Sequence, residues 1–175
     1  LHGQTKDALA KTKAGSWEYD IIIPGYKCNM TDIMASIGLV QLDRYPKLLE
    51  RRLELVAKYN KGFEGSRVIP LVHNTKDHKS SNHLYITHVE GATFEQRGEI
   101  ITKMAERGIS CNVHYKPLPL LTAYKNLGFD MNDYPNAYSY YVNEVTLPLH
   151  TRLSDEDVDV IVENFKEVIA EGVGE

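Results

Sequence analysis

The stretch PGYKCNMTDIMASIGLVQL (Pro24–Leu42) decides how the first part of this chain is expected to fold. A turn-forming loop leads directly into a helix, for which Thr31 and Asp32 supply N-cap oxygens. Apolar residues follow at helical spacing. Several residues of the same helix are small: Ala35, Ser36 and Gly38. Because glycine inside a helix costs about 1 kcal/mol relative to alanine, we expect close packing against another surface to offset it.

Composition and charge exclude several classes of protein. The 175 residues are 42% hydrophobic and 25% charged, which is ordinary for a globular domain. A net charge of -4 without a lysine or arginine run argues against nucleic-acid binding, and no apolar stretch is long enough to cross a membrane. Cys28 and Cys111 are predicted to be reduced thiols of a cytoplasmic protein. Because the chain starts with Leu1 and not with methionine, we expect a fragment.

The pattern along the chain predicts an α+β protein in three parts: an extended arm (1–30), a long bent connecting helix (31–65) and a small α+β domain (66–175). Trp17, Tyr19 and the isoleucines from Ile21 would form a short strand of the arm. Pro46 is expected to divide the connector into two helices, because proline disfavours helical geometry in the residue before it and is tolerated in a first turn. The buried face of the second helix is predicted to be Leu49, Leu53, Val56, Tyr59 and Phe63.

The small domain alternates between predicted strands and helices. Strands are expected over 68–72, 83–89, 109–115 and 145–149. A capping box of Thr93 and Gln96 begins the first helix, and the last helix begins at Ser154. Shorter helices are expected before Gly128 and over 135–143.

Two groups of polar residues are candidates for binding. His114, Tyr115 and Lys116 lie at a strand end before Pro117, where either a ligand contact or a purely structural histidine and a surface lysine would fit. Lys27 and Asn29 precede a helix N-terminus and could bind an anion there. Four histidines recur at a five-residue step, His73, His78, His83 and His88. That step shares one face of neither a helix nor a strand, so no metal site is predicted.

Taken in order, several segments resemble the sugar aminotransferase family of DegT/StrS type. They are His2-Gly3, Pro24–Ile33, Ala35–Leu39 with Gln41-Leu42, Glu50–Arg52, Ser81–Tyr85, Gly108-Ile109, His114–Pro117, Tyr124 and Leu147–Leu149. The resemblance spans essentially the whole chain and covers only the C-terminal portion of such an enzyme.

The resemblance implies a pyridoxal-phosphate-dependent enzyme of fold type I that moves an amino group, usually from glutamate, onto a nucleotide-linked keto-sugar of surface polysaccharide or related biosynthesis. Such enzymes are similar in being cytoplasmic homodimers. The family's Schiff-base lysine precedes the segment that resembles His2-Gly3, so no catalytic residue is expected in this chain, and the fragment alone should be inactive.

Individual roles also follow from the resemblance. Lys27 or Asn29 would meet the cofactor phosphate of the neighbouring subunit, and His114, Tyr115 and Lys116 would contact the sugar nucleotide or form the pocket wall. The alternatives left open are a non-catalytic module that binds sugar nucleotides and a dimerisation domain without a ligand.

Overall fold

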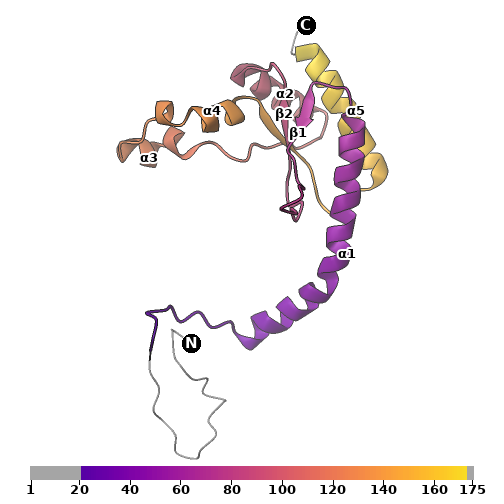
Figure 1. The fold of residues 1–175 in the computed structure, drawn as a ribbon. Coiled ribbons are helices and arrows are strands. Elements are labelled where there is room, and N and C mark those ends of the chain that lie inside the picture. The colour runs from indigo at the N-terminus through magenta and orange to yellow at the C-terminus, as the bar shows by residue number, and fades with distance from the viewer. Residues whose placement is uncertain (1–20, 173–175) are drawn as a thin grey trace, which may run out of the picture. The chain divides into compact units, whose positions relative to one another are not determined.

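A computed structural model describes residues 21–172 of the chain, so residues 1–20 of the expected arm, with most of its predicted strand, lie outside the described residues. Two compact units follow one another, and their boundary falls between Tyr45 and Pro46. The boundary lies inside helix α1 (Asp32–Gly62), which is labelled in Figure 1. Each unit has its own internal contacts.

The first unit contains the loop that leads into α1. The Oγ1 of Thr31 accepts a hydrogen bond from the Met34 backbone N–H at 3.3 Å, and its carbonyl accepts one from Ala35 at 2.9 Å. Thr31 thus caps the helix as the sequence predicts. The apolar residues of this part of α1 are exposed: Ile33, Met34, Ile37, Leu39, Val40 and Leu42. Within the described chain nothing covers them.

Helix α1 runs through Pro46 without interruption, whereas two successive helices were expected. Proline lacks the N–H that would bond to the carbonyl four residues earlier, Leu42. Residues 41–47 are all exposed, so water can hydrogen-bond to that carbonyl in place of the missing donor. Solvent exposure therefore lets the helix continue past the proline.

In the second unit, α1 buries Val56, Tyr59 and Phe63 as predicted, but its buried face includes Leu55 in place of Leu53. Leu55 and Tyr59 are 0% exposed, whereas Leu53 is 43% exposed. Gly62 lies on the same buried face of α1. A Cβ atom at this position would lie only 2.9 Å from a methyl carbon of Val162. This close approach of two helices sets the rotation of α1, and the predicted face was wrong at Leu53.

A three-stranded antiparallel sheet lies beside this helix. Its order is β1 (Val68–Pro70), β2 (Tyr85–Val89), β3 (Glu144–Leu147). In the register of β2 and β3, Thr87 pairs with Val145 and His88 with Glu144. Because side chains alternate along strands, each pair of partners faces the same side of the sheet.

One face of the sheet forms the core. Buried residues of β2 and β3 meet α1, α2 (Phe94–Glu106) and α5 (Asp155–Gly172) there. The Tyr59 and Tyr85 rings stack with centroids 4.5 Å apart, and the Phe165 ring meets Phe63 edge-on at 5.8 Å. Both tyrosine hydroxyls are satisfied, since they donate to Pro148 O and Asn60 Oδ1 at 2.8 Å each. The capping box of Thr93 and Gln96 is present at the start of α2, as predicted.

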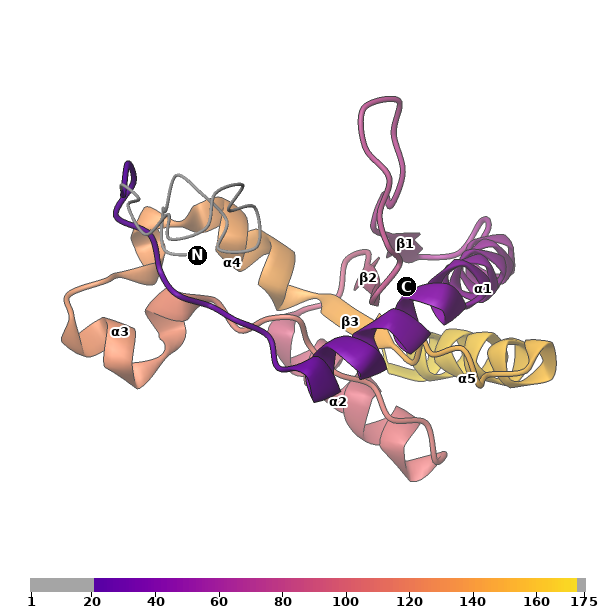
Figure 2. The same ribbon diagram turned by 90° about the horizontal axis from the view of Figure 1, so that it is seen from below.

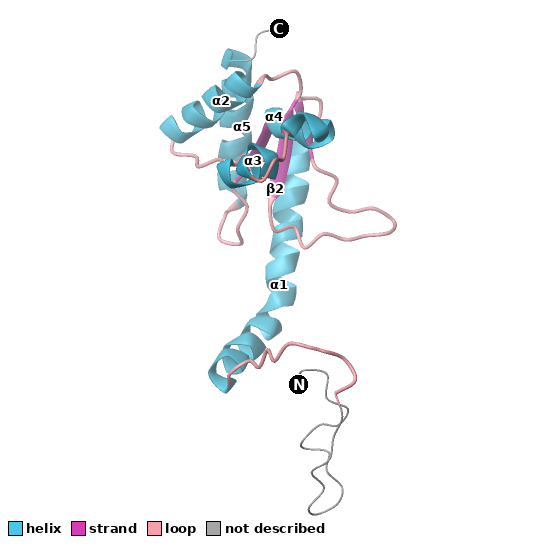
Figure 3. Ribbon diagram, turned by 90° about the vertical axis from the view of Figure 1, so that its left-hand side faces the viewer, coloured by secondary structure: helices cyan, strands magenta, loops and turns pink. Residues whose placement is uncertain are grey.

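The other face of the sheet carries the shorter helices. Figures 1 and 2 show α3 (Thr122–Asn126) and α4 (Pro135–Val142) on the side of the sheet away from α5, and Figure 3 looks onto this side. Two 3-10 turns, Leu118–Leu120 and Met131–Asp133, flank α3. None of the helices over residues 21–172 is long and apolar enough to span a membrane.

The strand expected over 109–115 is not formed. Only Asn112 pairs with the sheet, through two backbone hydrogen bonds of 3.0 and 2.8 Å to Thr146. The Asn112 side chain also accepts a hydrogen bond from the backbone N–H of Val113 at 2.8 Å, which competes with strand pairing. The segment is therefore a loop that is joined to the edge strand β3 through Asn112.

Replacing Leu55 by alanine should lower the free energy of unfolding by about 2–5 kcal/mol, because it leaves a cavity in the core. The same substitution at the exposed Leu53 should change it by no more than about 0.5 kcal/mol. Urea unfolding of the two variants, followed by circular dichroism, measures both. A larger loss at Leu53 than at Leu55 would contradict the observed rotation of α1.

The two cysteines, both free as predicted, should differ in reactivity. Burial raises the pKa of the Cys111 thiol to about 12, so at about pH 8 almost none of it is the nucleophilic thiolate. Cys28 is exposed. Iodoacetamide should therefore modify Cys28 much faster than the half-buried Cys111 in the folded chain, and the two at similar rates in denaturant, as peptide mass mapping would show. Equal rates in the folded chain would contradict the burial of Cys111.

Candidate functional site

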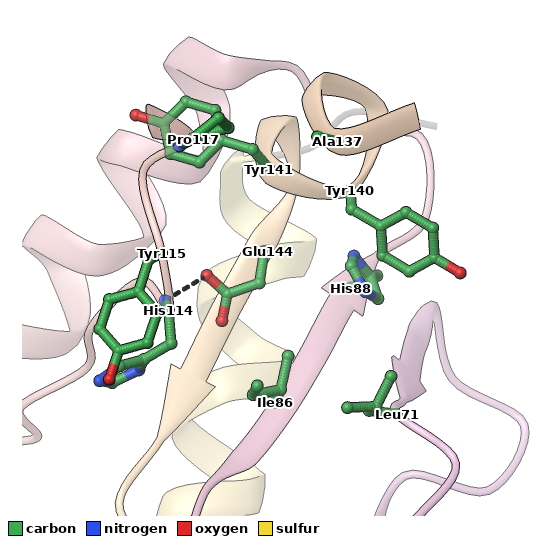
Figure 4. A pocket seen from close by; sticks show the side chains of 10 residues that line it. All are labelled: Leu71, Ile86, His88, His114, Tyr115, Pro117, Ala137, Tyr140, Tyr141 and Glu144. Atoms are coloured by element: carbon green, nitrogen blue, oxygen red, sulfur yellow. Dashed lines mark hydrogen bonds between the residues drawn. The ribbon is translucent and has the colours of Figure 1, made fainter. Parts of the chain in front are cut away.

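A pocket of about 290 Å³ lies on the open face of the sheet, where β2 and β3 meet α4 and the loop before Pro117. Figure 4 shows the residues around it. They are Leu71, Ile86, His88, His114, Tyr115, Pro117, Ala137, Tyr140, Tyr141 and Glu144. The pocket thus combines aromatic walls with two imidazoles and one carboxylate, a composition typical of small-molecule sites.

A buried carboxylate organises one side of the pocket. Glu144 is 3% exposed, and its Oε2 accepts the backbone N–H of His114 at 3.0 Å. Its other oxygen, Oε1, accepts the Thr146 hydroxyl at 2.5 Å. Thr146 Oγ1 in turn lies 2.9 Å from His114 Nδ1. Buried polar groups require such partners, so this chain of hydrogen bonds fixes both the loop and the ring of His114.

The opposite side of the pocket contains a second imidazole. His88 Nδ1 lies 3.2 Å from Asn143 Oδ1, and the His88 ring meets Tyr140 edge-on at 5.0 Å. The other nitrogen, Nε2, is buried and has no hydrogen-bond partner within the described chain. His88 is therefore oriented by Asn143, which lies between α4 and β3, and by Tyr140 of α4.

The structure brings only two of the three predicted substrate residues into this pocket. His114 and Tyr115 line it, with their rings in edge-to-face contact at 4.6 Å. Lys116 instead lines a separate hollow of about 250 Å³, together with Lys125. The wall residue Tyr141 is shared by both. Successive residues of this segment therefore serve two different cavities.

The hollow at Lys116 is positively charged and aromatic. Phe94, Tyr138 and Tyr141 contribute its rings. The guanidinium carbon of Arg97 lies 4.7 Å from the ring centroids of both Phe94 and Tyr141, a cation–π arrangement. With two lysines at the surface and an arginine behind the rings, this hollow is suited to an anionic group.

The predicted cofactor residues belong to the other unit. Lys27 and Asn29 are exposed, and neither makes a hydrogen bond or ion pair within the described residues. An ammonium and an amide close before the N-terminus of α1 are donors that a phosphate group accepts. Their chemistry fits the phosphate end of a cofactor, and the choice between them stays a prediction.

Three of the four regularly spaced histidines have side-chain hydrogen bonds, each to a different partner. His73 bonds to Ser80, His78 to Thr75 and His88 to Asn143. Burial lowers the pKa of His73. Over residues 21–172, no three histidine, cysteine or acidic side chains lie together in a way that could hold a metal ion.

Sequence reasoning missed Glu144, Thr146, His88 and Tyr140 as site residues. A signal for the first two was present, since Glu144 and Thr146 alternate with the apolar Val145 and Leu147. Alternation places polar residues on the face opposite the core. The same alternation places His88 opposite Thr87 and Val89, whereas no local pattern indicated its contact with Tyr140, because that contact joins segments far apart in the chain.

Comparisons with known proteins agree with the resemblance. The model of the DegT/DnrJ/EryC1/StrS aminotransferase family matches residues 1–166. The spore coat polysaccharide biosynthesis protein SpsC of Bacillus subtilis is 36% identical, over 97% of this chain and 44% of its own length. The UDP-4-amino-4,6-dideoxy-N-acetyl-beta-L-altrosamine transaminase of Helicobacter pylori is 30% identical, over 85% of this chain and 40% of its own length.

A solved structure agrees in fold. Spr1654 of Streptococcus pneumoniae, assigned as a sugar aminotransferase, is 66% identical in its PMP-form and superimposes with a TM-score of 0.83, over 99% of this chain and 43% of its own. It has also been solved in a PLP-form, and the family depends on pyridoxal phosphate. The chain spans less than half the length of these relatives and matches their C-terminal part. It belongs to the DegT/DnrJ/EryC1/StrS aminotransferase family.

Proposed function

We propose that this chain is the C-terminal part of a pyridoxal-phosphate-dependent enzyme that transfers an amino group, from glutamate, to a nucleotide-linked keto-sugar of surface polysaccharide biosynthesis. The observation that carries the proposal is the family match over residues 1–166. The names of the relatives support it, since they refer to spore coat polysaccharide and to a UDP-linked amino sugar. We infer a cytoplasmic location from the soluble sugar nucleotides that such an enzyme would use.

In this proposal the cofactor supplies the electron sink that lets an amino group move between an amino acid and a carbonyl compound. Lys27 or Asn29 would donate hydrogen bonds to its phosphate. The sugar would lie at the His114 and Tyr115 pocket, where aromatic walls can pack against the apolar faces of a pyranose ring. The anionic part of a sugar nucleotide would suit the hollow at Lys116.

The same proposal includes a homodimer. Ile33, Ile37 and Val40 lie at helical spacing on α1 and are 75%, 59% and 58% exposed. An apolar stripe of this kind is favourable only when another surface covers it. In the dimer, the rest of the subunit and a second copy would cover this apolar stripe. Lys27 and Asn29 would then lie near the active site of the second copy.

By the resemblance, the Schiff-base lysine belongs to the part of these enzymes that this chain does not match, so the 175-residue chain alone should not transaminate. Mixed with pyridoxal phosphate and glutamate, it should leave the absorbance spectrum of the cofactor unchanged, whereas the whole protein should convert it. Turnover by the chain alone would contradict the proposal. If calorimetry showed saturable binding of UDP-sugars by a whole protein that never transaminates, the binding-module alternative would replace it.

In the whole protein, replacing the residue that binds the cofactor phosphate should weaken pyridoxal phosphate binding about tenfold or more, because a hydrogen bond to a charged group contributes about 1.5–3 kcal/mol. Lys27→Ala and Asn29→Ala compared by equilibrium dialysis distinguish the two candidates. Lys76→Ala, in the exposed loop after β1, is the control and should leave the affinity unchanged. Wild-type affinity in both variants would remove this loop from the cofactor site.

A further inference from the structure

We propose that Glu144 and Thr146 are positioning residues that hold His114 in one tautomer, with its proton on Nδ1 and a lone pair on Nε2. The three side chains form a single line of hydrogen bonds. Thr146 Oγ1 stands in the middle, 2.5 Å from Glu144 Oε1 and 2.9 Å from His114 Nδ1. The positions of the hydrogens follow from what each group can donate.

A threonine hydroxyl has one hydrogen, and a carboxylate has none. Two oxygens 2.5 Å apart require a hydrogen between them, since their lone pairs would otherwise repel. That hydrogen comes from Thr146, so its Oγ1 can only accept from His114. The proton of a neutral His114 must therefore sit on Nδ1.

Burial prevents water from satisfying these groups in place of one another. Glu144 and Thr146 are 3% and 5% exposed, so water cannot readily replace either partner. The second carboxylate oxygen is already occupied by the backbone N–H of His114 at 3.0 Å. Glu144 thus fixes the main chain of His114 directly and its imidazole through Thr146, as Figure 4 shows for the first of these contacts.

The second imidazole of the pocket, that of His88, has the same tautomer, which a different hydrogen-bond partner fixes. The Asn143 amide donates from Nδ2 to Val89 O at 3.0 Å, which turns its Oδ1 toward His88. An amide oxygen only accepts, so His88 Nδ1, 3.2 Å away, must carry the proton. His88 Nε2 is fully buried, whereas His114 Nε2 is not.

The consequence is that His114 presents a hydrogen-bond acceptor at the edge of the pocket. Within the described chain its Nε2 has no partner. A ligand would therefore be selected for a donor at this point, such as a hydroxyl or an amine N–H, and against a group that only accepts. Naming a sugar hydroxyl as that donor rests on the proposed function, whereas the tautomer itself does not.

Nitrogen-15 NMR of the ligand-free chain at about pH 8, where an ordinary histidine is neutral, tests the tautomer without any activity measurement. Two-bond correlations from the ring hydrogens distinguish a protonated nitrogen from one with a lone pair. His114→Gln identifies the His114 signals among the seven histidines. The expected result is a proton on Nδ1 and a lone pair on Nε2. A proton on Nε2 would overturn the proposal.

Glu144→Gln should invert the tautomer. The amide oxygen must face the His114 backbone N–H, which leaves the NH₂ group facing Thr146 Oγ1. Thr146 then accepts from the amide and turns its own hydrogen toward His114 Nδ1, so the imidazole proton moves to Nε2. His88 should keep its proton on Nδ1 and is the internal control.

Thr146→Val and Thr146→Ser form a matched pair if Glu144→Gln does not fold, as judged by circular dichroism. Serine keeps the hydroxyl and should preserve the Nδ1 proton, whereas valine keeps the shape but removes the oxygen and should yield a mixture of tautomers. An unchanged tautomer in a folded Glu144→Gln variant, or the same tautomer in the valine and serine variants, would show that these residues do not position the proton.

Discussion

The antiparallel pairing of β2 with β3 is the constraint on which both the core and the pocket depend. In this register Thr87 faces Val145 on the core side, while His88 faces Glu144 on the other side. A slip of one residue would exchange the two faces of a strand, bury a histidine among the helices and expose the apolar partners. The core residues stabilise this register by burying apolar surface on one face of the sheet. The register in turn determines which polar side chains line the pocket on the other face.

The rotation of α1 depends in turn on a single close approach. Gly62 allows the helix to lie against Val162 of α5, and the stacked rings of Tyr59 and Tyr85 then meet at 4.5 Å. Ion pairs such as Lys58 with Asp159 and Arg107 with Glu167 surround this core. They are partly exposed pairs, which contribute little on their own. Burial of apolar and aromatic surface thus sets the geometry, and the ion pairs lie at its edge.

Much of this fold follows from local sequence, and the rest does not for identifiable reasons. The helix caps at Thr31 and Thr93 are predictable from residue types at fixed spacing, and the structure contains both caps. The helix through Pro46 and the loop at Asn112 differ from expectation because solvent exposure and side-chain hydrogen bonds outweighed the local pattern. At the site, His114 and Tyr115 were found as a polar cluster. Glu144 and Thr146 were not, because their role depends on contacts with His114 that span 30 and 32 positions of the chain.

The separation of His114 from Lys116 has a consequence for how this short segment can change during evolution. Adjacent residues that serve different cavities are not obliged to vary together. A substitution at Lys116 can alter the charge of one hollow while the hydrogen bonds from Glu144 keep His114 in place. The two cavities can thus change independently of each other. Pro117, which follows Lys116 directly and lines the His114 pocket, restricts the backbone at the end of this segment.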